Sequence, residues 1–330
     1  LDGRSGQGVA EAARVLRSGG TVALPTETVY GLGARGLDAD AVAAIYRAKG
    51  RPADNPLILH VTDLEAALPL WRLDDRGAER VRRLGAAHWP GPLTVVAPRS
   101  DLVPDCVTAG LQRVAVRVPA HPVAAALIRA VGEPLAAPSA NASGRPSPTC
   151  AEHVLRSLDG RIDAVLDAGP CAHGLESTVV DVSDEVPVIL RDGALPAAAL
   201  RRILPGLTRR APGTPAHTQD ASPGLRHRHY APLVGEVVLG TRARLESSWS
   251  TLDGLLVRAR TAASLLALLG PRPREALLVE LPDSPREFGR ELYAALYRAE
   301  LAAPLRLVLE APPPGDAWAA VRDRLLRASA

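Results

Sequence analysis

The sequence predicts an α/β protein of two domains, and three observations support this fold class. Helical and strand patterns alternate from residue 6 to 204 and again from 233 onward. The chain of 330 residues exceeds what one hydrophobic core usually organises, and its 47% apolar content is enough for two cores. Between the two regions, residues 205–231 are rich in Pro, Gly and polar residues. We therefore expect one domain over 1–204, a linker over 205–231 and a smaller domain over 232–330.

The first region begins with an amphipathic helix that ends at Gly19 and Gly20 and is followed by the apolar strand 21–25. Asp38 is placed to cap the next helix, which Gly50 ends. The other expected strands span 57–61, 93–97, 114–118, 134–138, 164–168, 177–182 and 186–191, and the other expected helices span 75–87, 122–131 and 150–158. Thr149 and Glu152 predict a capping box for the last of these helices.

The second region repeats the alternation on a smaller scale. Its expected strands span 235–239, 254–258, 276–281 and 305–311. One of its helices is opened by Ser284, Pro285 and Glu287, the residue types of a helix start. This pattern indicates a second α/β domain.

Charge and cysteine content exclude several classes of protein. The formal net charge of +3 is too small to imply nucleic-acid or membrane binding by itself. Cys106, Cys150 and Cys171 have no CxxC spacing, which indicates neither a disulfide framework nor a zinc site. No apolar run approaches the length of a membrane span, and the first residues are too polar for a signal peptide. We expect a cytoplasmic protein without a protein-bound metal.

Three residues belong to types rare enough in this chain to mark a site. Lys49 is the single lysine among 39 Lys and Arg residues, and Asn55 and Asn141 are the only asparagines. All three lie in polar stretches rich in Gly or Pro. An ammonium is a compact point charge and a guanidinium is a planar fork, so a site shaped around one of them rejects the other. The retained lysine therefore indicates a specific ligand.

Known catalytic motifs fit the sequence poorly. The stretch 31–36, "GLGARG", matches a dinucleotide fingerprint, but the segment before it is polar and contains Pro25, unlike a buried first strand. No phosphate-binding P-loop surrounds Lys49, and no serine, cysteine or threonine lies in a nucleophile elbow. We expect chemistry by positioning and electrostatic stabilisation instead.

Polar loops follow many of the expected strands, and in an open α/β sheet such loops converge on a ligand crevice. Several arginines and serines in these loops, with Lys49, would direct positive charge and hydrogen-bond donors at one pocket. These groups suit a phosphate-rich substrate. Each arginine taken alone is as well explained as a solvated surface cation.

Eight stretches together resemble the YrdC-type threonylcarbamoyl-AMP synthases, in the long form with a linker and an extra C-terminal domain. They are "LPTETVYGLGARG", "AKGRPADNPLILHV", "WPGPLTVV", "VAVRVPAHP", "PSANASGRPSPT", "GLESTVVDV", "ILRDGA" and "SPGLRHRHYAP". The resemblance covers most of residues 20–232. It implies a twisted mixed sheet with a basic central cavity, followed by a smaller Rossmann-like α/β domain.

The resemblance also implies an activity and a set of site residues. The family makes threonylcarbamoyl-AMP and pyrophosphate from L-threonine, bicarbonate and ATP, for the threonylcarbamoyladenosine of tRNA. The implied threonine pocket contains Thr28, His60, Arg117, Ala137 and Ser177. The implied ATP-binding residues are Lys49, Arg51, Asn55, Arg113, Ser139, Asn141, Ser147, Arg191 and Tyr230. Lys49 and Arg51 would be catalytic, by neutralising charge that develops on the phosphates.

Further expectations concern partners and rival functions. Mg²⁺ would arrive with the ATP phosphates, the product would pass to the tRNA threonylcarbamoyl transferase machinery, and neither a stable nucleic-acid complex nor a membrane would be required. "RHRHY", 226–230, would form a lid over the nucleotide. Two alternatives remain open: a carbamoyl-adenylating module of the hydrogenase-maturation type, and a non-catalytic RNA-binding protein.

Overall fold

A computed structural model describes residues 1–210 and 230–330, in two compact units. The first unit comprises Leu1–Ser143, Pro148–Ala172 and the chain from Glu176 to the end of the first described range. The second comprises Gly144–Ser147, His173–Leu175 and Arg228–Ala330, of which 228 and 229 lie outside the described residues. The expected linker 205–231 lies mostly outside them as well, and so does the expected lid, except Tyr230.

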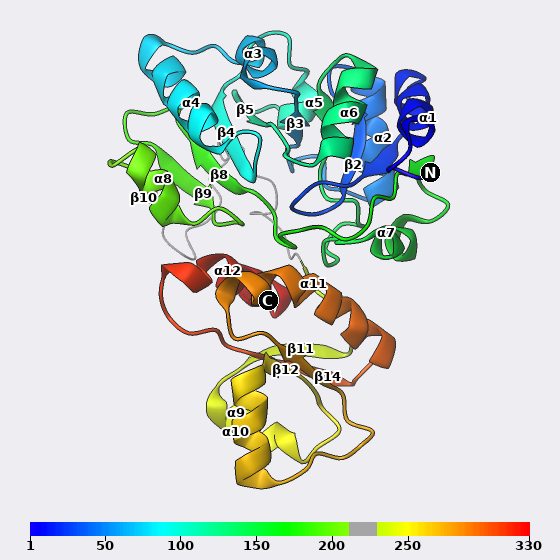
Figure 1. Ribbon diagram of the computed structural model, residues 1–330, viewed down its shortest axis with the longest axis vertical. Helices are drawn as coiled ribbons and strands as arrows, with labels where there is room; N and C mark the ends of the chain where they lie inside the picture. The colour runs from blue at the N-terminus through cyan, green and yellow to red at the C-terminus, as the bar shows by residue number, and fades with distance from the viewer. Residues whose placement is uncertain (211–229) are drawn as a thin grey trace. The chain divides into compact units, whose positions relative to one another are not determined.

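The first unit is a ten-stranded mixed sheet with helices on its faces (Figure 1). The strand order is β10-β9-β8-β4-β5-β3-β6-β2-β1-β7. The strands are β1 (Val22–Leu24), β2 (Gly31–Arg35), β3 (Ile58–His60), β4 (Leu93–Pro98), β5 (Arg113–Arg117), β6 (Leu135–Ala136), β7 (Ala164–Val165), β8 (Thr178–Asp181), β9 (Val188–Arg191) and β10 (Thr208–Arg209). The helices are α1 (Gly6–Arg17), α2 (Ala39–Lys49), α3 (Leu64–Ala67), η1 (Leu68–Leu70), α4 (Asp75–His88), α5 (Asp105–Thr108), α6 (Pro122–Val131), α7 (Ala151–Leu158) and α8 (Ala197–Ile203).

Side-chain alternation along the strands separates the core of this unit into two faces. In β1, Val22 and Leu24 belong to the apolar cluster that includes residues of α1 and α6, whereas Ala23 between them belongs to the larger cluster on the opposite face. This is the period-two pattern of a strand buried on both faces. Helices α1 and α6 lie side by side on their face of the sheet (Figure 1).

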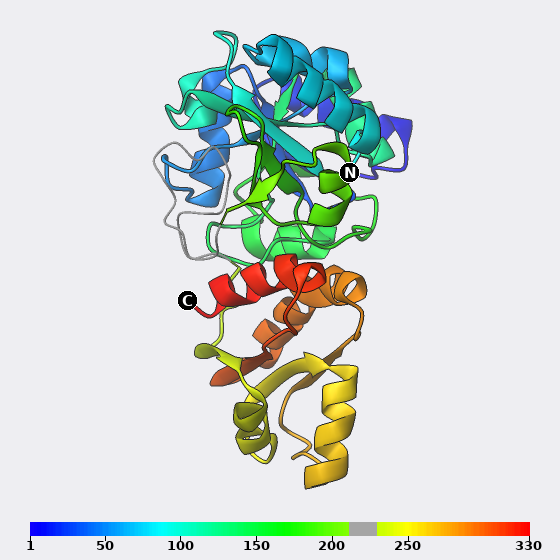
Figure 2. The same ribbon diagram turned by 90° about the vertical axis from the view of Figure 1, so that its left-hand side faces the viewer.

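The second unit contains a four-stranded parallel sheet of order β11-β14-β12-β13. Its strands are β11 (Glu236–Gly240), β12 (Gly254–Arg258), β13 (Leu278–Leu281) and β14 (Arg306–Glu310). Its helices are α9 (Arg242–Trp249), α10 (Ala259–Leu269), α11 (Pro285–Ala302), η2 (Asp316–Trp318) and α12 (Ala319–Ala328). Helices α9 and α10 cover one face of this sheet, and α11 and α12 cover the other (Figure 2). The mixed sheet and the smaller parallel sheet confirm the expected fold class.

Local structure follows the sequence signals in most places. The Asp38 side chain accepts hydrogen bonds from two backbone N–H groups at the start of α2, and Gly50 ends that helix with φ +58°. Ser284 caps α11 by accepting from the N–H of Glu287. The expected capping box at α7 was wrong: Cys150 is the N-cap residue and its side chain makes no capping bond. The Thr149 hydroxyl lies 3.3 Å from Nδ1 of His153 instead.

The glycine-rich stretch 31–36 is not a nucleotide loop. Most of it forms β2, which pairs antiparallel with β1 and with β6. A Cβ atom on Gly33 would lie 2.7 Å from the Leu24 side chain, so this glycine allows close packing within the sheet. Together with the polar segment that precedes it, this geometry excludes the dinucleotide-fingerprint interpretation.

Candidate functional site

Polar side chains from three neighbouring strands form a row across the middle of the large sheet. Thr94 of β4 is the register partner of Arg117 of β5, and Arg117 is the partner of His60 of β3. On the far side of His60, Leu135 of β6 continues the row, two residues before Ala137. The sheet register therefore brings residues from distant parts of the sequence together.

These side chains share one face of the sheet. His60 and Arg117 each lie two positions after an apolar residue of a small buried cluster, which are Ile58 and Ala115. Thr94 lies two positions before another member, Val96. Because side chains two apart in a strand point the same way, the three polar groups lie on the face of this cluster. The face pairs a buried cation with a hydroxyl and an imidazole.

Arg117 is held by three separate partners. Its Nη1 donates to Oγ1 of Thr28 over 2.8 Å, its Nε donates to the carbonyl oxygen of Gly91, and its Nη2 lies 2.7 Å from Oε1 of Glu27. Burial opposes the ionisation of Glu27, but the attraction of Arg117 outweighs it and lowers the pKa of this carboxyl below its usual range. The site therefore holds a fixed pair of opposite charges.

The Thr28 hydroxyl belongs to a directed chain of hydrogen bonds. It accepts from Arg117, and it lies 2.8 Å from the Thr26 hydroxyl. The Thr26 hydroxyl in turn donates to the carbonyl oxygen of Val29. Thr26 therefore has no proton left for Thr28, so the Thr28 hydroxyl donates to Thr26. This chain fixes the orientation of Thr28 and hence of Arg117.

His60 is a neutral imidazole in this environment. Burial, followed by the nearby charge of Arg117, lowers its pKa to about 3. Its Nδ1 lies 3.3 Å from the carbonyl oxygen of Ile58, which accepts only from a protonated nitrogen. The tautomer that fits this contact carries its proton on Nδ1. The lone pair of Nε2 is then free to accept a proton or a hydrogen bond from a ligand.

Ser177 and Arg191 extend the row toward the other edge of the sheet. The Ser177 hydroxyl lies 2.7 Å from the Thr94 hydroxyl, and Nη2 of Arg191 donates to both the carbonyl oxygen and the hydroxyl of Ser177. At the opposite end of the row, the backbone N–H of Ala137 donates to the carbonyl oxygen of Ile58. The structure thus connects all five expected threonine-pocket residues through neighbouring strands.

Lys49 lies at the end of α2 and reaches the loop after β6. Its Nζ donates to the carbonyl oxygens of Ser139 and Asn141, and its own carbonyl oxygen accepts from the N–H of Ser143. Burial, with a smaller contribution from the charge of Arg51, lowers the pKa of Lys49 well below its usual value. The single lysine of the chain is therefore a buried amine that joins two loops of expected ATP ligands.

Arg51 and Asn55 form the adjoining part of this network. Arg51 donates to the carbonyl and side-chain oxygens of Asn55 and to the carbonyl oxygen of Pro56. These bonds close the turn 51–56 around the guanidinium group, so Arg51 shapes the loop that follows Lys49.

Arg113 does not join these residues. It begins β5 while Arg117 ends it, a separation of about 13 Å at 3.3 Å per residue. Its guanidinium group is paired with Asp181 and Asp184 at 2.6 and 3.0 Å. Ser147 and Tyr230 belong to the second unit. The sequence interpretation also missed Glu27 and Thr94, although Thr94 is a polar residue within an apolar strand and Glu27 lies inside the quoted "PTET".

A mixed α/β sheet crossed by a row of buried polar side chains defines the class of this protein, and two family models identify its family. The Sua5/YciO/YrdC model, described as "Telomere recombination", matches residues 14–193. The model described as the C-terminal domain of threonylcarbamoyl-AMP synthase matches residues 195–330. The chain therefore belongs to the threonylcarbamoyl-AMP synthase family, in its long form with the C-terminal domain.

Individual relatives agree with this assignment. A threonylcarbamoyl-AMP synthase from Pyrococcus abyssi is 39% identical over 96% of this chain and 93% of its own length. One from Bacillus subtilis is 47% identical over 68% of this chain and 64% of its own length. The crystal structure of P. abyssi Sua5 complexed with L-threonine superposes with a TM-score of 0.87 at 36% identity, covering 97% of this chain and 94% of that one.

The described residues contain neither a membrane-spanning helix nor a cluster of metal ligands. Within residues 1–210 and 230–330, no helix combines the length and apolarity that a membrane crossing needs. Over the same residues, no three His, Cys, Asp or Glu side chains gather as ligands of one metal ion.

Proposed function

We propose that the protein is an L-threonylcarbamoyladenylate synthase that binds L-threonine on the polar row of the large sheet. The observation that supports this most is the buried pair of Arg117 and Glu27 beside Thr28. An amino acid carries one charge of each sign, and this pair offers one charge of each sign in return. Arg117 would bind the threonine carboxylate and Glu27 would face the ammonium group.

The remaining residues of the row would select and activate the amino acid. Ser177 and Thr94 offer hydroxyl groups 2.7 Å apart, which can meet the threonine hydroxyl. His60, neutral above about pH 3, offers Nε2 as a hydrogen-bond acceptor for the threonine amine. The amine in its deprotonated form takes up CO₂ or bicarbonate to form N-carboxythreonine.

ATP would bind to the network around Lys49, with Mg²⁺ carried by its phosphates. Asn141, Ser139 and Arg191 are expected to contribute, as Ser147 and Tyr230 of the second unit are. The carboxylate of N-carboxythreonine attacks the α-phosphorus and pyrophosphate leaves, so bicarbonate, threonine and ATP yield threonylcarbamoyl-AMP, pyrophosphate and water. Lys49 and Arg51 would stabilise charge on the phosphates. We place this reaction in the cytoplasm and assign the next step to the tRNA threonylcarbamoyl transferase machinery.

Pyrophosphate release from ATP tests the proposal directly. We expect release only when L-threonine and bicarbonate are both present, with each omitted in turn as the control. Release without threonine, or salt-sensitive RNA binding with no turnover, would contradict the proposed function.

A further inference from the structure

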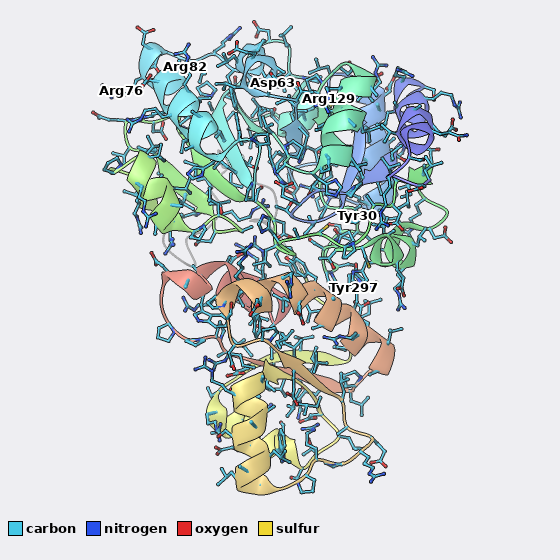
Figure 3. All side chains as sticks on the ribbon, in the orientation of Figure 1. Tyr30, Asp63, Arg76, Arg82, Arg129 and Tyr297 are labelled. Carbon is cyan, nitrogen blue, oxygen red and sulfur yellow. The ribbon has the colours of Figure 1, made fainter. Side chains whose placement is uncertain are left out.

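One face of helix α11 contacts three separate segments of the second unit. Gly289, Tyr293, Tyr297 and Glu300 lie within about 80° of one another around the helix axis, at 100° per residue. Tyr297 is labelled on this helix in Figure 3. Each of the four residues meets a segment that is far away in the sequence.

Glu300 uses both of its carboxylate oxygens. Oε2 lies 2.6 Å from Nη2 of Arg145, and Oε1 accepts from the backbone N–H of Leu233 at 2.9 Å. The Arg145 and Glu300 side chains are 20% and 12% exposed, so water screens this ion pair only in part. A single carboxylate thus ties the segment 144–147 to the chain that enters β11.

Tyr297 holds the same segment one helical turn earlier. Its hydroxyl donates to the carbonyl oxygen of Pro146 over 2.8 Å, in a buried position. The carbonyl oxygen of Gly144 accepts from the N–H of Ala231, so residues near the end of the linker contact the segment as well. Three polar contacts therefore hold three consecutive residues, 144–146.

The other two positions of the helix face hold the remaining segments by close packing. A Cβ atom on Gly289 would lie 2.7 Å from Cδ1 of Leu175, so any larger residue here would have to displace this leucine side chain. Tyr293 packs against Tyr230, with ring centroids 5.5 Å apart. Cζ of Arg324 lies 5.3 Å from the centroid of the same Tyr230 ring. Tyr230 is held with φ +66°, a conformation that needs such support.

We infer that this face of α11 positions the substrate loop 138–148, and that Glu300 and Tyr297 are positioning residues for ATP binding. The inference rests on the proposed function. Residues 144–147 continue by peptide bonds from Ser139 and Asn141, whose carbonyl oxygens accept from Lys49. Ser147, an expected ATP ligand, lies within the held segment. The C-terminal domain therefore contributes to catalysis through the loop that it orders.

Two conservative variants test this inference. Glu300→Gln keeps the shape of the side chain but removes its charge, and Tyr297→Phe removes only the hydroxyl group that reaches Pro146. The matched control is Glu291→Gln, because Glu291 lies on the same helix and pairs with its neighbour Arg290. All three variants should keep a melting temperature close to that of the wild type.

Hydrogen exchange measures the positioning without any need for activity. We expect the backbone amides of Gly144, Arg145 and Ser147 to exchange about tenfold faster in Glu300→Gln and Tyr297→Phe, and at the wild-type rate in Glu291→Gln. Unchanged exchange of this peptide in both test variants would overturn the inference.

Steady-state kinetics measure the consequence for the substrate. We expect the KM for ATP to rise about three- to tenfold in the two test variants, while the KM for threonine stays within about twofold. Arg145→Gln added to Glu300→Gln should cause no further loss, because the first change already breaks the ion pair. Equal rises in both KM values would overturn the inference, whereas wild-type protein without threonine-dependent turnover would contradict the proposed function and leave the exchange result intact.

Discussion

Nη2 of Arg117 lies 2.7 Å from Oε1 of Glu27, and both side chains are more than nine-tenths buried. Each charge is removed from water and depends on the other for compensation. Thr28 accepts from Nη1 and Gly91 accepts from Nε of the same guanidinium group, so the pair is part of the folded framework as well as of the proposed threonine pocket.

Replacing Glu27 by glutamine should destabilise the protein, because Arg117 would keep a buried charge without a counter-charge. We expect Glu27→Gln to lower the free energy of unfolding by about 3 kcal/mol, measured by urea denaturation. Glu11→Gln is the control, since Glu11 pairs with Arg14 on the surface of α1, where water screens the pair, and its loss should leave stability almost unchanged. Equal costs for the two variants would show that the buried pair is not needed for stability.

Replacing Lys49 by arginine should abolish catalysis without unfolding the protein. Lys49 is only 3% exposed and directs a compact ammonium group between two carbonyl oxygens, where a planar fork cannot be aligned. We expect pyrophosphate release by Lys49→Arg to fall at least about a hundredfold. Arg47→Lys, on the exposed side of the same helix turn, should retain full activity. Wild-type turnover by Lys49→Arg would refute the assigned role.

ATP binding should be accompanied by proton uptake at Lys49. Burial and the charge of Arg51 lower the pKa of this amine in the free protein, and the phosphates would raise it again. At a pH between the two values a proton is taken up on binding, so the affinity for ATP should fall as the pH rises through that range. Calorimetry in two buffers of different ionisation enthalpy measures this uptake. Lys49→Met should show none, and unchanged uptake in that variant would assign the proton to another group.

His60 should make the fold sensitive to acid. Its pKa is about 3 in the folded protein and about 6.5 in an unfolded chain, so between these values the unfolded chain binds a proton that the folded protein does not. Stability should therefore fall as the pH drops from about 6.5 toward 3. Between pH 7 and pH 4.5, the free energy of unfolding should fall by about 2 kcal/mol less in His60→Gln than in the wild type. Urea denaturation at the two pH values measures this difference. An identical pH dependence would show that His60 is not buried as a neutral group.

Sequence patterns predicted the helices and strands more accurately than they predicted the tertiary contacts between them. The capping residues of α2 and α11 and the strands β4, β5 and β12 were found from local signals that the structure retains. Strand β2 was missed because its sequence "GLGAR" carries glycines where a strand former is expected, and only the packing against Leu24 explains them. The short strand β10 was missed because two residues show no periodicity.

Site residues that lie in a recognisable sequence motif could be predicted. Residues that become neighbours only through the pairing of strands could not. Arg113 and Arg117 stand at the two ends of one strand, yet their separation of four positions along β5 gives them entirely different surroundings. Thr94 joins Ser177 only through the pairing of β4 with β8, which no single-sequence pattern reveals. The ion pair between Arg117 and Glu27 also depends on the tertiary structure, because 90 residues separate the two in the sequence.

The interleaved second unit limits how this protein can be recombined with its relatives. Grafting residues 230–330 from a homologue would leave the recipient's own Gly144–Ser147 and His173–Leu175 facing a foreign α11. A chimaera is therefore expected to have mismatched contacts with α11 unless these two short segments are transferred together with residues 230–330. Substitutions at Leu175 should likewise be tolerated only with a matching change at Gly289, and substitutions at Arg145 only with a matching change at Glu300.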